Sequence, residues 1–230
     1  MTQDELKALV GQAALHYVEP GSIVGVGTGS TVNKFIDALA TMKDRIAGAV
    51  SSSVASTERL QAIGIKVFDA TEVDELAVYI DGADEIDHAG YMIKGGGAAL
   101  TREKIVAAQS RKFVCIADES KLVQTLGRFP LPVEVMPFGL AATRRAVEAA
   151  AAASGCPGPA KLRQGKDGHA FVTDGGHWIL DASLNRISDP KLLADRLSSI
   201  PGVVEHGLFI GLAQAVILAG PTGARVVERS

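Results

Sequence analysis

The chain has 230 residues, of which 47% are hydrophobic and 21% charged, and its mean hydropathy is +0.20. This composition excludes a disordered chain and allows either one large domain or two small ones. A net charge of -3 and an isoelectric point near 6.0 give no basic surface of the kind that neutralises phosphates, so we expect no nucleic-acid partner.

The N-terminal segment and the cysteines indicate the cellular compartment of the protein. Residues 1–22 carry acids among apolar residues, unlike the basic and then continuously apolar start of a signal peptide. No apolar run reaches the roughly 20 residues that cross a bilayer. Cys115 lies in an apolar run and Cys156 in a Gly/Pro-rich stretch, so we expect free thiols. We therefore expect a cytoplasmic protein that has no membrane partner.

Short apolar runs alternate with helical patterns through the first half of the chain, which predicts βαβ units and a parallel sheet. Helices are expected over residues 32–42 and 56–64, with Gly64 ending the second. Right-handed crossovers place such helices on both faces of the sheet. The expected strands are residues 22–26, 46–50, 65–69, 76–80 and 113–117.

The pattern changes at residues 129–138, where three prolines occur, and a long alanine-rich helix is expected over 139–155. Strands at 169–173 and 177–182 are expected around a turn, followed by a helix that has Pro190 in its first turn. The C-terminal β-type runs are expected to rejoin the first sheet or to form its edge. We expect a Rossmann-like domain formed by residues 1–128 plus 205–230, and a smaller α+β domain at 129–204.

The segment GVGTGST, residues 25–31, follows an expected strand and opens an expected helix, where free N–H groups and the helix dipole favour an anion. Ser30 stands where the dinucleotide fingerprint needs its third glycine. The hydroxyls of Thr28, Ser30 and Thr31 suit one compact phosphate. The alternative is a tight capped turn that binds no ligand.

Asp81 and Asp84, in the segment DGAD, follow the expected strand 76–80 and so lie at its carboxyl edge, where open α/β sheets bind ligands. Two neighbouring carboxylates can have their pKa values pushed apart, which suits acid–base chemistry. The alternative is a turn in which both side chains bond only the local backbone.

Lys94 precedes three glycines, whose backbone N–H groups can approach a ligand closely. This lysine could stabilise an oxyanion, or it could be a solvated residue of a flexible loop. Glu103, in the next expected helix, projects toward Leu100 and Val106. Partial desolvation there should raise its pKa toward the range of a general base. The alternative is a first-turn acid that favours the helix dipole.

Six segments together resemble the signature segments of the ribose-5-phosphate isomerase type A family: GVGTGST, SSSVAST, DGADEID, IKGGGAALTREK, IADESK and PLPVEV. The resemblance implies a Rossmann-like domain with a smaller, ferredoxin-like α+β domain. It implies interconversion of ribose 5-phosphate and ribulose 5-phosphate in the non-oxidative pentose phosphate pathway, without a metal or other cofactor. It also implies a homodimer or a higher homo-oligomer.

The resemblance assigns roles to residues of this chain. Glu103 would move a proton through an enediolate, Asp81 would assist ring opening, and Asp84 with Lys94 would hold the reacting oxygens. The substrate-binding residues would be Thr28, Gly29, Ser30, Thr31 and Lys121 at the phosphate, with Gly82, Ala83, Gly95, Gly96 and Gly97 lining the site.

Other functions are compatible with parts of the sequence. A sugar-phosphate sensor would not need Glu103 and would require a DNA-binding segment, which we do not find. A nicotinamide-dependent dehydrogenase would need the missing fingerprint glycine. Sugar-phosphate deaminases and lactonases of related fold would not be expected to carry the run KGGGAALTREK. Residues 148–170 are more alanine- and glycine-rich than the family resemblance implies.

Overall fold

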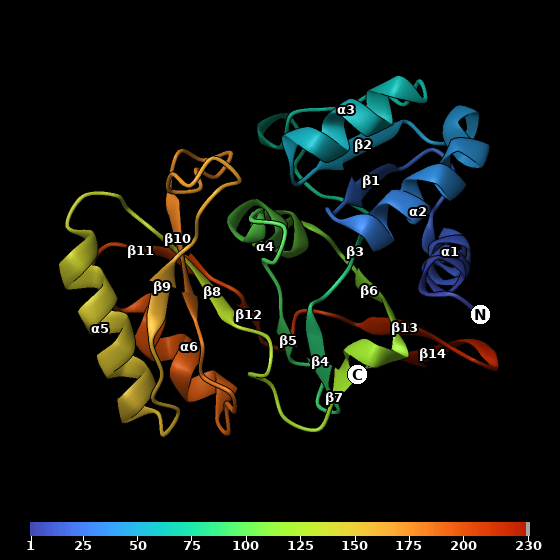
Figure 1. The fold of residues 1–230 in the computed structure, drawn as a ribbon. Helices are drawn as coiled ribbons and strands as arrows, with labels where there is room; N and C mark the ends of the chain where they lie inside the picture. The colour runs from blue at the N-terminus through green and yellow to red at the C-terminus, as the bar shows by residue number, and fades with distance from the viewer. Residues whose placement is uncertain (229–230) are drawn as a thin grey trace. The chain divides into compact units, whose positions relative to one another are not determined.

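The computed structural model describes residues 1–228, which form two compact units (Figure 1). Unit 1 comprises residues 1–83, residues 102–121 and the C-terminal segment from residue 211. Unit 2 comprises residues 84–101 and 122–210. Unit 1 has one sheet and unit 2 has two, and each unit has its own buried core.

Unit 1 is built on a six-stranded sheet whose order is β14-β13-β6-β3-β1-β2. All neighbouring strands are parallel except β13 and β14, which form an antiparallel pair. The strands are β1 (Ile23–Val26), β2 (Gly48–Ser51), β3 (Val78–Asp81), β6 (Phe113–Asp118), β13 (Ala215–Gly220) and β14 (Gly223–Glu228). The helices are α1 (Gln3–Ala14), α2 (Ser30–Leu39), α3 (Val54–Ala62) and α4 (Leu100–Gln109). The first two residues of α4 belong to unit 2. The 3-10 turns are η1 (Leu15–Tyr17), η2 (Ala40–Arg45), η3 (Ala70–Glu72) and η4 (Glu119–Lys121).

Alternation along the strands gives this sheet two different faces. Val78 and Ile80 pack in one core with Phe35 and Ile36 of α2, whereas Tyr79 points to the other face. There its ring centroid lies 5.1 Å from that of Phe113. Both faces of β3 are therefore buried, as expected for a parallel sheet covered by helices.

Unit 2 contains an antiparallel sheet of order β11-β8-β10-β9 and two helices, in the chain order β-α-β-β-α-β. This is the ferredoxin-like arrangement. Its elements are β8 (Leu131–Val135), α5 (Leu140–Ala153), β9 (Ala160–Leu162), β10 (Trp178–Ala182), α6 (Pro190–Ser198) and β11 (Val203–His206). A second sheet, of order β12-β5-β4-β7, comprises β12 (Leu208–Phe209), β5 (Met92–Ile93), β4 (Glu85–Asp87) and β7 (Leu122–Val123).

The expected fold class is confirmed: a mainly parallel sheet flanked by helices is accompanied by a smaller α+β unit. Pro190 occupies the first turn of α6, and the Asp189 carboxylate caps this helix by accepting a hydrogen bond from the Leu192 N–H at 3.0 Å. Gly64 follows α3 with a φ of +81°, a left-handed conformation that favours glycine. The C-terminal runs rejoin the first sheet as β13 and β14.

The expected strand at 65–69 is wrong. Within this run only Val67 forms a bridge, an isolated one to Ala49 of β2, which is an edge strand of the sheet. The extended run stops because the Asp69 carboxylate accepts a hydrogen bond from the Thr71 N–H at 2.9 Å and thereby caps η3.

The expected strand at 169–173 is also wrong. The place beside β10 is taken by β9, and the Arg163 N–H extends this pairing by donating to the Ile179 carbonyl at 2.8 Å. The later segment pairs instead with residues 163–164, through the Phe171 N–H and an isolated bridge at Ala170. The expected turn after Thr173 is present, because the Thr173 N–H donates to the His177 carbonyl at 2.9 Å.

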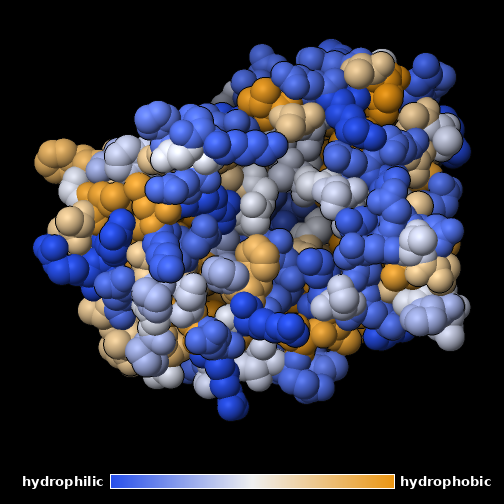
Figure 2. Space-filling model, viewed as in Figure 1, coloured by the Kyte–Doolittle hydropathy of each residue, from blue (hydrophilic) through white to orange (hydrophobic). Residues whose placement is uncertain are grey.

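The large apolar residues are mostly buried in the cores of the two units, and the surface is mainly hydrophilic (Figure 2). Hydrophilic residues predominate on the face shown in Figure 2, and apolar residues are scattered across it. Cys115 and Cys156 are both buried and are free thiols, as expected. No helix within residues 1–228 has the length and apolar character needed to cross a membrane.

Candidate active site

The strands β1, β3 and β6 of unit 1 are adjacent and parallel, so their carboxyl ends meet at one edge of the sheet. The segments that leave this edge are residues 27–31 after β1, residues 82–83 after β3 and residues 119–121 after β6. In open α/β sheets this edge is the one that binds ligands. Gly82 and Thr31 are neighbours there, since a Cβ on Gly82 would lie 3.9 Å from the Thr31 Cβ.

The N-terminus of α2 is open toward solvent. Gly29 precedes the helix with a φ of +110° and offers no side-chain cap, and both Gly29 and Ser30 are exposed. The N–H groups of the first turn are therefore available to an anion. The Lys7 ammonium donates to Ser30 Oγ at 3.0 Å and adds positive charge. Sequence reasoning missed Lys7, because only folding brings α1 to this loop.

Thr28 is held differently from Ser30. Its hydroxyl is hydrogen-bonded to the Ser53 and Ser56 hydroxyls, the latter at 2.9 Å. The Ser56 hydroxyl donates in turn to the Gly27 carbonyl at 2.7 Å. These serines come from the segment SSSVAST, which the sequence had linked to the family but to which it had assigned no contact. They fix the shape of the loop before α2.

Asp81 ends β3 and is fully buried. Its Oδ1 accepts hydrogen bonds from the Gly82 N–H at 2.7 Å and the Thr28 N–H at 3.2 Å, and its Oδ2 accepts one from the Tyr79 hydroxyl at 2.5 Å. Burial, with the charges of Asp81 and Glu103, raises the pKa of Tyr79 well above its ordinary value. Tyr79 therefore remains a hydrogen-bond donor to the carboxylate.

Glu103 lies on the buried side of α4, with 2% of its surface exposed, whereas Ile105 is 56% exposed. This confirms the face expected from the helical pattern. The charge of Glu103 acts on the Tyr79 hydroxyl, as does that of Asp81. The two carboxylates thus influence the same tyrosine.

The segment after β6 carries Asp118 and Lys121. Asp118 is buried, and its Oδ1 accepts a hydrogen bond from the Ser120 N–H at 3.0 Å. Lys121 ends η4 and is partly exposed at the same strand end. Asp118 was not singled out from the sequence, although its position at the end of an expected strand was a usable signal.

Asp84, Lys94 and the three glycines belong to unit 2. The Asp84 N–H donates to the Ile93 carbonyl at 2.9 Å, and Asp84 Oδ2 accepts a hydrogen bond from the Gly96 N–H at 2.8 Å. Lys94 is only 3% exposed, and its Nζ lies 5.3 Å from the centroid of the Phe209 ring. Lys94 is therefore not the solvated side chain of a flexible loop.

The first turn of α4 is anchored in unit 2 by Glu134, from the segment PLPVEV. This carboxylate is 3% exposed. Its Oε2 accepts a hydrogen bond from Thr101 Oγ1 at 2.5 Å, and its Oε1 accepts one from Thr173 Oγ1 at 2.8 Å and contacts His177 Nδ1 at 3.0 Å. The segment PLPVEV, which contains Glu134, is part of the family resemblance, but the resemblance gave Glu134 no role.

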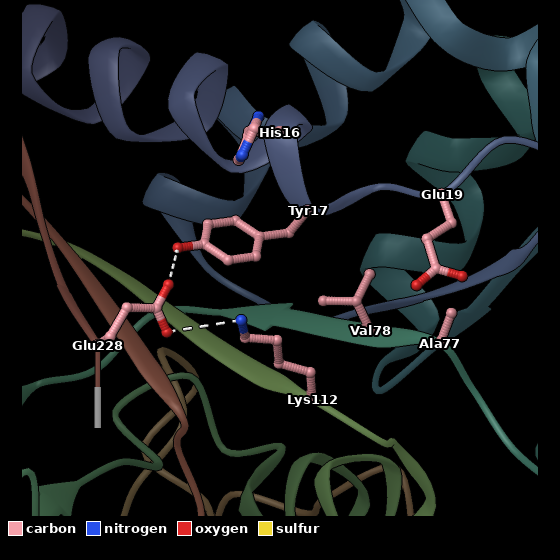
Figure 3. A pocket seen from close by; sticks show the side chains of 7 residues that line it. All are labelled: His16, Tyr17, Glu19, Ala77, Val78, Lys112 and Glu228. Carbon is pink, nitrogen blue, oxygen red and sulfur yellow. Dashed lines mark hydrogen bonds and ion pairs between the residues drawn. The ribbon is translucent and has the colours of Figure 1, made fainter. Parts of the chain in front are cut away.

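Unit 1 also has a pocket of about 350 Å³, shown in Figure 3. Val78 and Lys112, among its lining residues, mark the amino ends of β3 and β6, opposite to the strand ends described above. The Tyr17 hydroxyl donates to Glu228 Oε1 at 2.7 Å, and Lys112 Nζ lies 3.5 Å from Glu228 Oε2. None of the residues predicted to carry the chemistry lines this pocket.

The fold and these groups define an α/β enzyme of phosphorylated sugars: an open helix N-terminus flanked by lysine, with buried carboxylates at strand ends. Residues 48–223 match the family model of ribose 5-phosphate isomerase A (phosphoriboisomerase A). This chain belongs to that family.

Relatives match over nearly the whole chain. Ribose-5-phosphate isomerase A of Polaromonas sp. (strain JS666) is 71% identical over 228 residues, which are 99% of this chain and 94% of the relative. The protein of the same name from Rhodopseudomonas palustris (strain TIE-1) is 55% identical over 233 residues. This match covers 100% of both chains.

Solved structures agree. Ribose 5-phosphate isomerase A from Neisseria gonorrhoeae has a TM-score of 0.91 and 44% identity, covering 100% of this chain and 98% of the other. A D-ribose-5-phosphate isomerase in complex with phospho-erythronic acid has a TM-score of 0.92 and 34% identity, with both chains fully covered.

Proposed function

We propose that this enzyme carries out the reaction of its family through an enediolate, with Glu103 as the base. It interconverts ribose 5-phosphate and ribulose 5-phosphate. The observation that carries the assignment of the base is the burial of the Glu103 carboxylate on α4, where its charge acts on the Tyr79 hydroxyl. A desolvated carboxylate is well suited to taking a proton from carbon.

In the forward direction, Glu103 removes the proton from C2 of the open-chain aldose, and the electron pair forms the C1–C2 double bond of the enediolate. The same carboxyl group returns the proton to C1, while a proton moves from the C2 hydroxyl to the C1 oxygen. The product is the ketose. Asp81 assists the preceding opening of the furanose ring, and its hydrogen bond from the Thr28 N–H couples it to residues 27–31, the phosphate loop that precedes and begins α2.

The phosphate group is bound at the N-terminus of α2. Ser30 and Thr31 offer hydroxyl and backbone N–H groups, and Gly29 lets the anion approach the helix end. Lys7, through its contact with Ser30, and Lys121 supply positive charge. Binding energy gained at the phosphate positions the reacting carbons, which lie at the other end of the substrate.

Negative charge on the enediolate oxygens is stabilised by Lys94 and by the Gly97 N–H, with Asp84, held by the Gly96 N–H, binding a hydroxyl group. The ligand named for the solved relative supports this view. Phospho-erythronic acid ends in a planar, negatively charged carboxylate, which resembles the planar, negatively charged end of an enediolate. We expect it to bind this enzyme more tightly than ribose 5-phosphate does.

The test is an assay of the chelator-treated protein with ribose 5-phosphate in deuterium oxide. Ketose formation with incorporation of solvent deuterium at the transferred position supports an enediolate formed without a metal. Transfer with complete retention of hydrogen, or activity only after a divalent metal is added, contradicts the proposed mechanism. The matched control is the Glu103→Gln variant under the same conditions.

We also propose a cytoplasmic homodimer. The buried free thiols of Cys115 and Cys156 suit a reducing compartment. Phe138 is 92% exposed and Met136 is 44% exposed in the segment before α5, which favours a protein contact there. Sedimentation of the wild-type protein and the Phe138→Ser variant tests this. A wild-type monomer at micromolar concentration contradicts the dimer.

A further inference from the structure

The three glycines after Lys94 form a tight turn. The Ala98 N–H donates to the Gly95 carbonyl at 3.0 Å, so Gly96 and Gly97 are the two central residues of a β-turn. Both are exposed, although the residues on either side of them are buried. Because two glycines tolerate either orientation of the peptide between them, the turn sequence does not select one orientation.

Arg163 supplies the selection. Its Nη1 donates to the Gly95 carbonyl at 3.0 Å and to the Gly96 carbonyl at 3.2 Å. The same guanidinium is held from behind by Asp181: Nε donates to Oδ2 at 2.9 Å and Nη2 donates to Oδ1 at 2.5 Å. The two side chains are only 16% and 27% exposed. This is the two-pronged geometry that arginine, and not lysine, provides.

The orientation of the carbonyl groups fixes the orientation of the N–H groups. No peptide within residues 1–228 is cis, and in a trans peptide the C=O and N–H bonds point in opposite directions. With the Gly95 and Gly96 carbonyls directed at Arg163, the N–H groups of Gly96 and Gly97 are directed away from it. The Gly96 N–H indeed reaches the opposite side, where it donates to Asp84 Oδ2 at 2.8 Å.

We infer that Arg163, fixed by Asp181, is a positioning residue that orients the Gly95–Ala98 turn so that the Gly96 N–H holds Asp84 and the Gly97 N–H serves the reacting end of the substrate. Arg163 acts through the turn and through Asp84 and does not touch the substrate. The inference rests on the proposed function in one respect, which is that Asp84 and the Gly97 N–H act on the enediolate.

The positions of Gly95 and Gly96 leave no room for larger side chains. A Cβ on Gly95 would lie 2.7 Å from the Leu100 Cδ2, and one on Gly96 would lie 2.7 Å from Asp84 Oδ1. The turn therefore cannot be stiffened by larger side chains at these positions. Rigidity has to come from outside the turn, and Arg163, 68 residues along the chain from Gly95, provides it.

The experiment compares Arg163→Lys and Asp181→Asn with wild type. The control is Arg186→Lys, at an exposed arginine of the same unit. Three quantities are measured: kcat with ribose 5-phosphate, the Kd of phospho-erythronic acid and the Kd of inorganic phosphate. The ratio of the two Kd values reports the reacting end of the site separately from the phosphate end, and it does not depend on the fraction of folded protein.

For Arg163→Lys we expect kcat to fall by about 10- to 100-fold, as when an oxyanion donor is displaced. Phospho-erythronic acid should bind about tenfold more weakly, while the Kd of phosphate stays unchanged. Asp181→Asn, a milder change, should shift both quantities in the same direction by less. Arg186→Lys should leave all three as in wild type.

Unchanged kcat and an unchanged Kd ratio in Arg163→Lys overturn the inference, as does equal weakening of both ligands, which marks a general loss of structure. Failure of the proposed function looks different, because the wild-type protein itself then forms no ketose. In that case the ratio of the two Kd values still decides whether Arg163 orients the turn. If Arg163→Lys does not fold, Asp181→Asn provides the same comparison.

Discussion

Gly27 and Asp81 are in such close contact that no side chain fits between them: a Cβ on Gly27 would lie 2.0 Å from Asp81 Cγ and 2.6 Å from its Cβ. The contact joins the loop after β1 to the end of β3, where the Asp81 carboxylate also accepts the Thr28 N–H. A glycine is required at position 27 because backbone and carboxylate share this space.

The first prediction concerns this contact. Gly27→Ala should lower the free energy of unfolding by roughly 1–3 kcal/mol, because the methyl group must displace a buried side chain. It should also lower kcat/KM, because Asp81 and the phosphate loop move apart. Urea denaturation and initial rates measure the two effects. For stability the control is Gly82→Ala, where the nearest atom to a Cβ is 3.7 Å away. Equal losses in both variants would contradict the argument.

Glu103→Gln should lower kcat by at least about a hundredfold while KM stays near the wild-type value, because it removes the base and preserves shape. Hydrogen exchange at C2 should be lost in parallel. Glu58→Gln, at an exposed position on α3, is the control and should behave as wild type. Turnover by Glu103→Gln at the wild-type rate would remove Glu103 from the proposed mechanism.

Lys7→Met should raise KM for ribose 5-phosphate by about tenfold with a smaller change in kcat, since a charged hydrogen-bond partner of the phosphate site is lost. Unphosphorylated ribose should be a very poor substrate for the wild-type enzyme, and Lys7→Met should not affect its turnover further. Kinetics with both sugars test this, with the exposed Lys43→Met as control. An equal loss with both sugars would show that Lys7 does not act through the phosphate.

Much of unit 1 follows from local pattern. The strands and the buried side of α4 obey simple periodicities, so Glu103 could be predicted to face the core. The failures at 65–69 and 169–173 have a different origin. At 65–69 the Asp69 side chain ends the extended run by accepting a hydrogen bond from the Thr71 N–H. At 169–173 the place beside β10 is already taken by β9.

Contacts that support the candidate residues could not be predicted in this way. Lys7 and Ser30 are 23 residues apart, and Arg163 and Gly95 are 68 residues apart. Neither pair belongs to a repeating pattern, so only the tertiary fold shows the contact. The family resemblance pointed to the groups that we propose carry the chemistry, but not to the residues that hold them.

Tyr17 predicts a change in stability at high pH. Its burial and its hydrogen bond to Glu228 raise the pKa of Tyr17 from 10.0 to about 12. The folded chain therefore holds this proton more tightly than the unfolded chain. The associated stabilisation is complete below pH 10 and is lost as the pH rises to about 12. Unfolding midpoints of Tyr17→Phe should depend less steeply on pH in this window. Glu228→Gln should act likewise, and a slope equal to that of wild type would contradict the assignment.

Glu134 should couple energetically to Thr101. The hydrogen bond between Thr101 Oγ1 and Glu134 Oε2 ties the first turn of α4 to β8, and Glu103 lies two residues further along the same helix. Glu134→Gln should cost roughly 1–3 kcal/mol of stability, because the neutral amide serves three partners less well than a carboxylate.

The decisive measurement is a double-mutant cycle with Thr101→Val, in both unfolding free energy and kcat. A coupling free energy of about 0.5–3 kcal/mol in unfolding is expected for residues in one hydrogen-bond network. The kcat values should be non-additive too, since either single variant already releases the turn that precedes Glu103. Strictly additive effects in both measurements would mean that the hydrogen bond does not hold α4. Loss of activity in Glu134→Gln would then have to act through Thr173 or His177, the other contacts of this carboxylate.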